Sequence, residues 1–226
     1  MTQRPEPSGP RVADRSEPEP DFDSLTNTDL VLIAQREPVR GVALMHRRFS
    51  AEVNRLVWRL LGADPDHNDL VQQVFVKVLT NSHRLREPER LGAWVQSITV
   101  NTVYEELRKR EVRRIFLREW REPAIYPNLV HDVEVRDFLV QSKAIIEKLP
   151  AKERVVFMLH FVEGRTLAEV AELMDYSLAT AKRRLAAANK RFESLLGNNA
   201  DLRRLLEERK LRLENGAGAA AEEEGA

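Results

Sequence analysis

The segment from Leu149 to Leu196 decides the fold. It reads LPAKERVVFMLHFVEGRTLAEVAELMDYSLATAKRRLAAANKRFESLL, with apolar residues at helical spacing. Pro150 stands where a helix can begin, and Gly164 ends that helix. The run Thr166-Leu-Ala-Glu169 has the Thr-x-x-Glu pattern of a capping box, which opens a second helix. Ser177 is a good N-cap for a third. The segment therefore predicts three short helices.

The third helix carries basic and hydroxyl side chains in its first two turns. They are Ser177, Thr180, Lys182, Arg183 and Arg184. Four apolar residues are expected to pack beneath them: Leu178, Ala181, Leu185 and Ala188. Two short helices joined by a tight turn, the second basic near its start, form a helix-turn-helix, which places early residues of its second helix in the major groove of DNA. The alternative is a solvated helix of an all-α bundle whose basic residues bind nothing.

The composition is that of a globular protein and is compatible with a reducing compartment. The chain has 226 residues, enough for one large or two small helical domains. It has no cysteine, which excludes disulfides and thiolate metal sites. No apolar run approaches the ~20 residues that span a bilayer, and the Pro- and charge-rich N-terminus is unlike a secretory signal. We therefore expect a cytoplasmic protein with no direct membrane insertion.

Charge is distributed unevenly, although the formal net charge is zero. Counting Lys and Arg against Asp and Glu gives +3 for residues 22–114 and +3 for residues 142–197. The three segments outside these blocks each carry −2. Neither block is basic enough to bind DNA tightly through charge alone, so we expect help from a larger partner.

Residues 28–114 read as a series of helices. Two short helices come first, separated at Glu37-Pro38 because the residue before a proline avoids the α region. Ser50 is expected to cap a third helix, which Gly62 closes. Asp64-Pro65 then supplies an N-cap followed by proline at the first helical position. A fourth helix is therefore predicted to begin at this point.

The helix after Pro65 has the most regular pattern in the chain. Its apolar stripe consists of Leu70, Val71, Val74, Phe75, Val78 and Leu79. Its polar face is rich in amides and poor in charge, and consists of Asp69, Gln72, Gln73 and Lys77. Such a face is either an ordinary solvated surface or a surface that docks another protein.

A polar, basic loop at residues 80–88 leads into a long helix that contains Trp94 and Asn101. A tryptophan at such a position packs in a core more often than it stacks on a base. Asparagine is a poor helix former and is usually retained for its hydrogen bonds, so Asn101 is unusual in mid-helix. The helix ends in a run of cations. Cations favour a helix C-terminus in any case, so this run alone says little about function.

These patterns predict an all-α fold with two helical domains joined by a linker. The predicted parts are a disordered tail (1–24), a helical bundle (25–114), a linker (115–141), the helix-turn-helix domain (142–197), and a C-terminal segment (198–226) with an amphipathic helix at Asp201–Leu213 followed by a disordered tail.

The sequence contains no pattern typical of catalysis. It has no Gly-rich phosphate loop, no metal-ligand spacing and no nucleophile arrangement. Five scattered histidines are interpreted as structural or surface residues: His46, His67, His83, His131 and His160. We therefore expect neither an enzyme, nor a cofactor, nor a metal site.

Several motifs, in this order, resemble those of the extracytoplasmic-function (group IV) sigma factors of bacterial RNA polymerase. Asp69-Leu-Val-Gln72-Gln73-Val-Phe75 resembles the D-L-V-Q-E-x-F signature of that family's region 2. Trp94-Val-Gln-Ser-Ile98-Thr-Val-Asn101, followed by Glu105 and Arg108, resembles W-L-x-x-I-A-x-N followed by Asp and Arg. The family's region 4 is matched at Leu149-Pro150, Glu163-Gly164, Thr166–Ala171, Thr180, Lys182 and Arg184.

The resemblance implies a factor that binds core RNA polymerase, recognises the −10 and −35 promoter elements and initiates transcription of a specific gene set. The polar face of Asp69, Gln72, Gln73 and Lys77 would dock on the clamp coiled coil of the largest subunit, and the flap would be a second contact. Residues of the Ser177 helix would read the −35 element. The −10 element would be bound by Asn81, Ser82, His83, Arg84, Arg86, Trp94, Asn101 and Arg108. An anti-sigma factor or another regulator is a further expected partner.

The chain departs from the family pattern at a few positions. Ser97 stands where the family usually has arginine, and Ala187 and Asn189 lack the cations that usually extend the recognition helix. These departures leave open a sigma-derived protein that binds polymerase or a regulator without opening promoters. A free-standing helix-turn-helix regulator is a third possibility, but it leaves the motifs at 69–75 and 94–108 unexplained.

Overall fold

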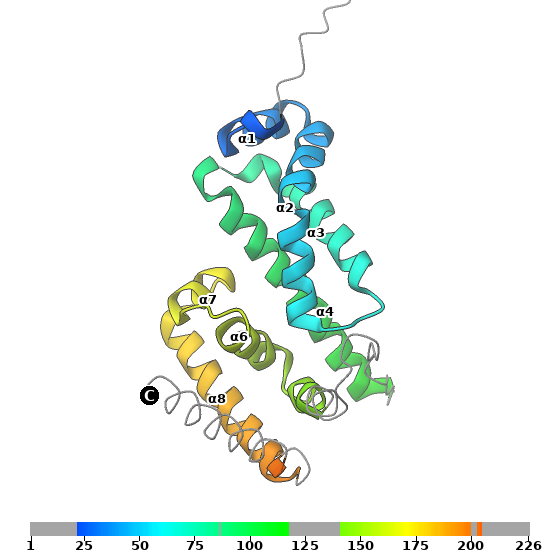
Figure 1. The fold of residues 1–226 in the computed structure, drawn as a ribbon, viewed down its shortest axis with the longest axis vertical. Helices are drawn as coiled ribbons and strands as arrows, with labels where there is room; N and C mark the ends of the chain where they lie inside the picture. Colours follow the sequence, from blue (N-terminus) through cyan, green and yellow to red (C-terminus); the bar gives the residue numbers. More distant parts are fainter. Residues whose placement is uncertain (1–21, 86, 118–140, 200–202, 205–226) are drawn as a thin grey trace, which may run out of the picture.

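The structure is a computed structural model that describes residues 22–85, 87–117, 141–199 and 203–204. These residues form helices, and no strand occurs among them, which confirms the predicted all-α class. Figure 1 shows two groups of helices stacked along the long axis of the molecule. We call helices α1–α4 the N-terminal bundle. The C-terminal bundle comprises the helical residues 141–147 and helices α6, α7 and α8.

Helices α1 (Asn27–Arg36) and α2 (Pro38–Leu61) cross closely at the start of the N-terminal bundle. A Cβ atom on Gly41 would lie 2.2 Å from the Cα of Ala34, so only glycine permits this approach. The predicted break before Ser50 is wrong, because α2 runs through it without interruption. Buried residues on both sides of Ser50 continue one apolar stripe: Val42, Met45, Phe49, Val53, Leu56, Val57 and Leu60.

Helix α3 (His67–Asn81) begins later than predicted, although Gly62 ends α2 as expected. Asp64 does not cap α3. One oxygen of its carboxylate accepts a hydrogen bond from the backbone N–H of Asp66 at 2.9 Å, and the carboxylate also binds Arg110. The predicted apolar stripe is confirmed: five of its members are buried and Leu79 packs against the core. Two short 3-10 turns, Ser82–Arg84 and Pro88–Arg90, then lead into α4 (Leu91–Leu117).

The C-terminal bundle contains the three helices that the deciding segment predicts. They are α6 (Ala151–Phe161), α7 (Leu167–Leu173) and α8 (Leu178–Gly197). Pro150 precedes α6 as its N-cap residue, and Gly164 adopts a positive φ of 70° just after that helix ends. Ala181 and Ala188 of α8 are fully buried, as expected. Leu178 is 44% exposed, so its predicted burial is wrong.

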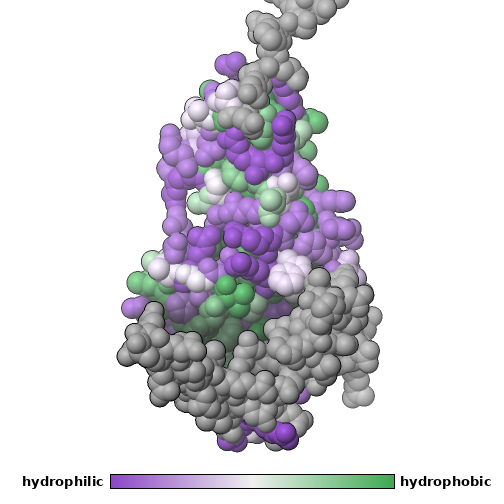
Figure 2. Space-filling view, in the orientation of Figure 1, coloured by the Kyte–Doolittle hydropathy of each residue, from purple (hydrophilic) through white to green (hydrophobic). Residues whose placement is uncertain are grey.

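The two bundles pack directly against each other and share one apolar core. Val155, Val156 and Leu159 of α6 are fully buried and belong to the same hydrophobic cluster as the core of α2, α3 and α4. Figure 2 shows a mostly hydrophilic face over the N-terminal bundle, with apolar side chains gathered towards the α6–α8 end. Among the described helices, none has the length and apolar character needed to cross a membrane.

Several sequence predictions lie outside the described residues. They concern the N-terminal tail up to residue 21, Arg86, most of the linker including His131, and the C-terminal tail. Of the helix predicted at Asp201–Leu213, only Arg203 and Arg204 are described, and both are helical.

Candidate nucleic-acid interface

Helices α7 and α8 form the helix-turn-helix, and both predicted caps are present. The backbone N–H of Thr166 donates to Glu169 Oε2 at 2.8 Å, while Thr166 Oγ1 accepts from the backbone N–H of Glu169 at 3.3 Å. The hydrogen bonds from Thr166 hold the pKa of the Glu169 carboxyl below its usual value. Ser177 Oγ accepts from the backbone N–H of Thr180 at 3.2 Å and so starts α8.

The turn between α7 and α8 is set by backbone hydrogen bonds. The N–H of Tyr176 donates to the carbonyl of Ala171 at 2.8 Å, and the N–H of Asp175 donates to the carbonyl of Glu172 at 3.3 Å. Asp175 has a φ of 54°, so these bonds form a Schellman motif with an aspartate in the left-handed position. This motif fixes the direction in which α8 leaves α7.

The start of α8 presents two cations to solvent. Lys182 and Arg183 are exposed, whereas Arg184 and Thr180 are half-buried. Arg184 Nε is buried and has no hydrogen-bond partner. The exposed pair can therefore reach a phosphate or a base edge without any rearrangement of the bundle.

The residues predicted for the −10 element lie on the loop after α3 and along α4. Asn81 donates its amide to the carbonyl of Lys77 at 2.8 Å, and His83 is exposed. Ser82 is buried and donates to the carbonyl of Leu79 at 3.0 Å, so its hydroxyl faces the protein. The side chain of Arg84 and the whole of Arg86 lie outside the described part of the chain.

Three predicted residues of α4 differ in their surroundings. Trp94 is half-buried and packs against the core, while Arg108 is exposed. The Asn101 amide donates to the Ser97 carbonyl at 2.9 Å and to the carbonyl of Leu173, in α7, at 3.3 Å. The unusual mid-helix asparagine is therefore bonded to both bundles. Ser97 adds a hydrogen bond of 3.0 Å to the same carbonyl of Leu173.

The predicted polymerase-docking face lies on α3. Asp69, Gln72 and Gln73 are exposed side by side on that helix. Lys77 is half-buried, and its ammonium group lies 2.7 Å from a carboxylate oxygen of Glu105 on α4. Three of the four side chains are thus free to meet a partner, and the fourth ties α3 to α4.

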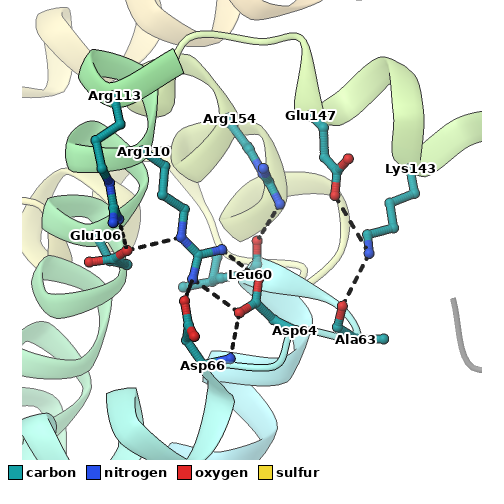
Figure 3. Close-up of polar contacts among 10 residues, drawn as sticks. All are labelled: Leu60, Ala63, Asp64, Asp66, Glu106, Arg110, Arg113, Lys143, Glu147 and Arg154. Carbon is teal, nitrogen blue, oxygen red and sulfur yellow. Dashed lines mark hydrogen bonds and ion pairs between the residues drawn. The ribbon is translucent and has the colours of Figure 1, made fainter. Parts of the chain in front are cut away.

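A charged network lies where α4 passes the turn between α2 and α3 (Figure 3). Arg110 binds Asp64, Asp66 at 2.9 Å, and Glu106 at 3.0 Å. Burial would raise the pKa of Asp64, but the hydrogen bonds and charge of Arg110 outweigh it and hold that pKa below its usual value. Burial likewise opposes the charge of Arg110, but Asp64 and Glu106 raise its pKa. This network was not foreseen, because the sequence pattern suggested only a cationic helix end.

The C-terminal bundle contacts the end of α2 and the turn after it, beside this network. Arg154 of α6 is 8% exposed and donates to the carbonyl of Leu60 at 3.4 Å, and burial lowers its pKa. Lys143 donates to the carbonyl of Ala63 at 3.3 Å. We call this side of the interface between the bundles the α6 contact (Figure 3).

The other side of the interface, which we call the α7 contact, joins the first half of α4 to α7 and the residue before it, Arg165. This contact includes the hydrogen bonds that Ser97 and Asn101 donate to the Leu173 carbonyl. In addition, Arg165 donates to Gln96 Oε1 at 3.0 Å, and Arg90 forms an ion pair with Glu172. A cavity of about 470 Å³ opens here, with Trp94 and Ser97 in its lining. Sequence reasoning missed Arg90 and Gln96, because no local pattern indicates that α7 lies over α4.

Among the described residues, the histidines and the other candidate metal ligands form no cluster of three or more. His67 shares a hydrogen bond with Asn54 at 3.0 Å, and His160 shares one with the carbonyl of Arg165 at 2.8 Å. No group of three or more His, Cys, Asp or Glu residues that could hold a metal ion occurs in the described part of the chain.

Two family models match the chain in the order of its two bundles. The model described as Sigma-70 region 2 matches residues 45–113, and the model described as Sigma-70, region 4 matches residues 142–192. Among curated proteins, the chain is 27% identical over 160 residues to the ECF RNA polymerase sigma factor SigE of Mycolicibacterium smegmatis, covering 68% of this chain and 61% of that protein. It is also 27% identical over 143 residues to the RNA polymerase sigma factor SigV of Bacillus subtilis, covering 60% and 79%.

Two solved structures share the fold. One is CnrH in complex with the cytosolic domain of CnrY, with a TM-score of 0.50 and 20% identity over 76% of this chain and 97% of that one. The other is the sigma factor RpoE in complex with the anti-sigma factor NepR from Bartonella quintana, with a TM-score of 0.50 and 22% identity over 68% and 94%.

Proposed function

Since the chain belongs to the sigma-70 family, and within it to the extracytoplasmic-function sigma factors, we propose that its two bundles divide promoter recognition between them. As a member of this family the chain is a transcription initiation factor and not an enzyme. It binds core RNA polymerase and promoter DNA, and an anti-sigma factor is an expected partner, as in the RpoE–NepR complex. Its place of action is the cytoplasm, where polymerase and promoters are found.

The −35 element is read by the start of α8. The observation that carries this assignment is the exposed pair of Lys182 and Arg183, held at the start of a helix that Ser177 caps. An arginine or lysine there can contact guanine in the major groove, and nearby hydroxyl groups can contact phosphates. Arg184 is half-buried, so its aliphatic stem helps to pack the helix while its guanidinium adds positive charge.

The −10 element is held by α4 and the loop before it. Exposed His83 and Arg108 would contact the strand, and the part of the Trp94 ring that is not buried would stack on a base. Asn101 would hydrogen-bond an unstacked base once its amide is released from Leu173. The exposed carboxylate and amides of α3 would dock on the clamp of the polymerase.

The function is tested by run-off transcription with the purified chain, core polymerase and a pool of genomic fragments. We expect transcripts from a small set of promoters that core polymerase alone does not use. The double variant Lys182→Ala/Arg183→Ala should reduce transcription from a cognate promoter by about tenfold or more, because each lost base contact costs about 1–3 kcal/mol.

Lys190→Ala is the matched control, because Lys190 is an exposed cation of the same helix far from its N-terminus. It should transcribe like the unchanged chain. If the double variant also transcribes normally, α8 does not read the −35 element. If the unchanged chain binds polymerase but produces no transcript from any fragment, it is a polymerase-binding protein without promoter activity.

A further inference from the structure

The α7 contact covers the part of α4 to which the −10 function is assigned. Asn101, a residue proposed to bind the −10 strand, bonds the carbonyl of Leu173 at 3.3 Å, and Ser97 bonds the same carbonyl at 3.0 Å. Beside them, Arg165 bonds Gln96, and Arg90 pairs with Glu172. Four polar side chains of α4 and the turn before it are thus engaged by the C-terminal bundle rather than open to a ligand.

This arrangement is too compact for a promoter. The names of the two elements place them about 25 base pairs apart, or ~85 Å at about 3.4 Å per base pair. In the structure, α8 begins at Leu178, five residues after Leu173. Five residues span at most ~18 Å, so the start of the recognition helix lies within roughly 20 Å of Asn101. The two elements cannot be bound at once unless the bundles separate.

The hydrogen bonds and the ion pair of the α7 contact join polar groups, so α7 can separate from α4 at a low cost in free energy. The side chains of Arg90 and Glu172 are 56% and 58% exposed, so water replaces each partner readily when the pair separates. A cavity also opens beside this pair. Every group named here is polar and remains hydrogen-bonded to water after separation, as is typical of interfaces between domains that move.

We propose that the described structure is a closed form in which α7 acts as an internal cover for the −10 face of α4. The inference rests on the proposed function. The Leu173 carbonyl occupies the donors of Ser97 and Asn101, and the Glu172 carboxylate occupies Arg90 as a strand phosphate does in the open form. Arg90 and Gln96 are therefore additional residues of the −10 site, and single-stranded DNA competes with the C-terminal bundle for them.

The first experiment locks the cover in place. Because the chain contains no cysteine, Ala93→Cys and Glu172→Cys, both in the wall of the cavity, can be joined by a short bismaleimide. The joined protein should lose at least about tenfold of its run-off transcription, while the unjoined double variant and each single variant treated with the reagent remain active. Full activity of the joined protein would overturn the inference, whereas inactivity of the unchanged chain would instead overturn the proposed function.

The second experiment loosens the cover. Arg165→Ala/Glu172→Ala removes one positive and one negative side chain from the C-terminal bundle without altering α4. We expect the free full-length chain to bind a fluorescent pool of random single-stranded DNA about three- to tenfold more tightly, and its radius of gyration in solution to increase. Lys190→Ala/Glu193→Ala, an exposed pair of the same charges on α8, is the control and should change neither value. Equal DNA affinity of both double variants would contradict the cover.

The assignment of Arg90 is tested in the loosened variant. There Arg90→Ala should weaken binding of the DNA pool and reduce the slope of log affinity against log salt by about 1, because one phosphate contact is lost. A purely structural role for Arg90 would leave the salt slope unchanged, and that result would remove Arg90 from the −10 site.

Discussion

The α6 contact and the α7 contact, the two sides of the interface between the bundles, differ in how deeply their side chains are buried. At the α6 contact, Arg154 is 8% exposed, and Val155 and Val156 beside it are fully buried. At the α7 contact, Arg90 and Glu172 are more than half exposed and lie beside a cavity. Ion pairs in water contribute little because water competes for both partners, whereas exposing a fully buried apolar side chain to water costs about 1.5–3 kcal/mol. We therefore expect the bundles to begin to separate at α7, above the part of α4 that is proposed to bind the −10 element.

The charged network beneath the α6 contact should give the largest effect. Arg110→Ala leaves three carboxylates without their common partner: Asp64, Asp66 and Glu106. We expect the free energy of unfolding to fall by about 2–4 kcal/mol, which urea denaturation measures. Arg108→Ala, at an exposed position of the same helix, should change it by no more than about 0.5 kcal/mol. Similar losses for the two variants would show that the network contributes no more than a surface charge.

The same network should make the fold sensitive to acid. The pKa of Asp64 in the folded chain lies below its value of about 3.9 in an unfolded chain, so its contribution is complete above pH 4 and is lost as the pH falls through the folded value. Denaturation midpoints at pH 7 and pH 3 should differ less in Asp64→Asn than in the unchanged chain. Asp69→Asn, at an exposed site, should retain the full difference.

The buried charge of Arg154 on α6 allows a test of whether charge or apolar packing stabilises the α6 contact. Arg154→Met keeps most of the side-chain volume and removes a desolvated guanidinium, for which the described residues supply one hydrogen bond, to the Leu60 carbonyl. We expect the free energy of unfolding to stay unchanged or to rise by up to about 1 kcal/mol, because apolar packing replaces a costly charge. A fall of more than about 2 kcal/mol would mean that the charge itself holds the α6 contact.

The smallest effect is expected at the α7 contact. Glu172→Ala removes an ion pair that is more than half exposed, so the free energy of unfolding should change by less than about 0.5 kcal/mol. Urea denaturation of this variant beside Arg110→Ala compares the two sides directly. If Glu172→Ala costs as much as Arg110→Ala, both sides hold equally and α7 is not the side that opens first.

Local patterns in the sequence were sufficient to place the three helices α6, α7 and α8. Glu169, three residues after Thr166, predicted the cap of α7, and Ser177 predicted the cap of α8, because both caps are hydrogen bonds within a few residues. Predictions that needed knowledge of distant partners failed. Ser50 could have capped a helix, but its neighbours continue one buried stripe. Asp64 could have capped α3, but it binds Arg110 instead.

The sequence predicted which residues belong to the candidate site but not which distant residues contact them. Lys182 and Arg183 are exposed as the helix-turn-helix pattern implied, because the same spacing that buries Ala181 and Ala188 turns them outward. Nothing near Asn101 in the sequence indicated that the Leu173 carbonyl would meet it, since the two residues are 72 positions apart.

Periodicity, capping and motif spacing along the chain are enough to predict the all-α class, the order of the two bundles, the caps of α7 and α8 and the family. The contact of α6 with the turn between α2 and α3, and that of α7 with the first half of α4, emerge only in the folded chain. The physical reason is that contact between two bundles depends on the shape and charge of whole faces, which helices far apart in the chain build together.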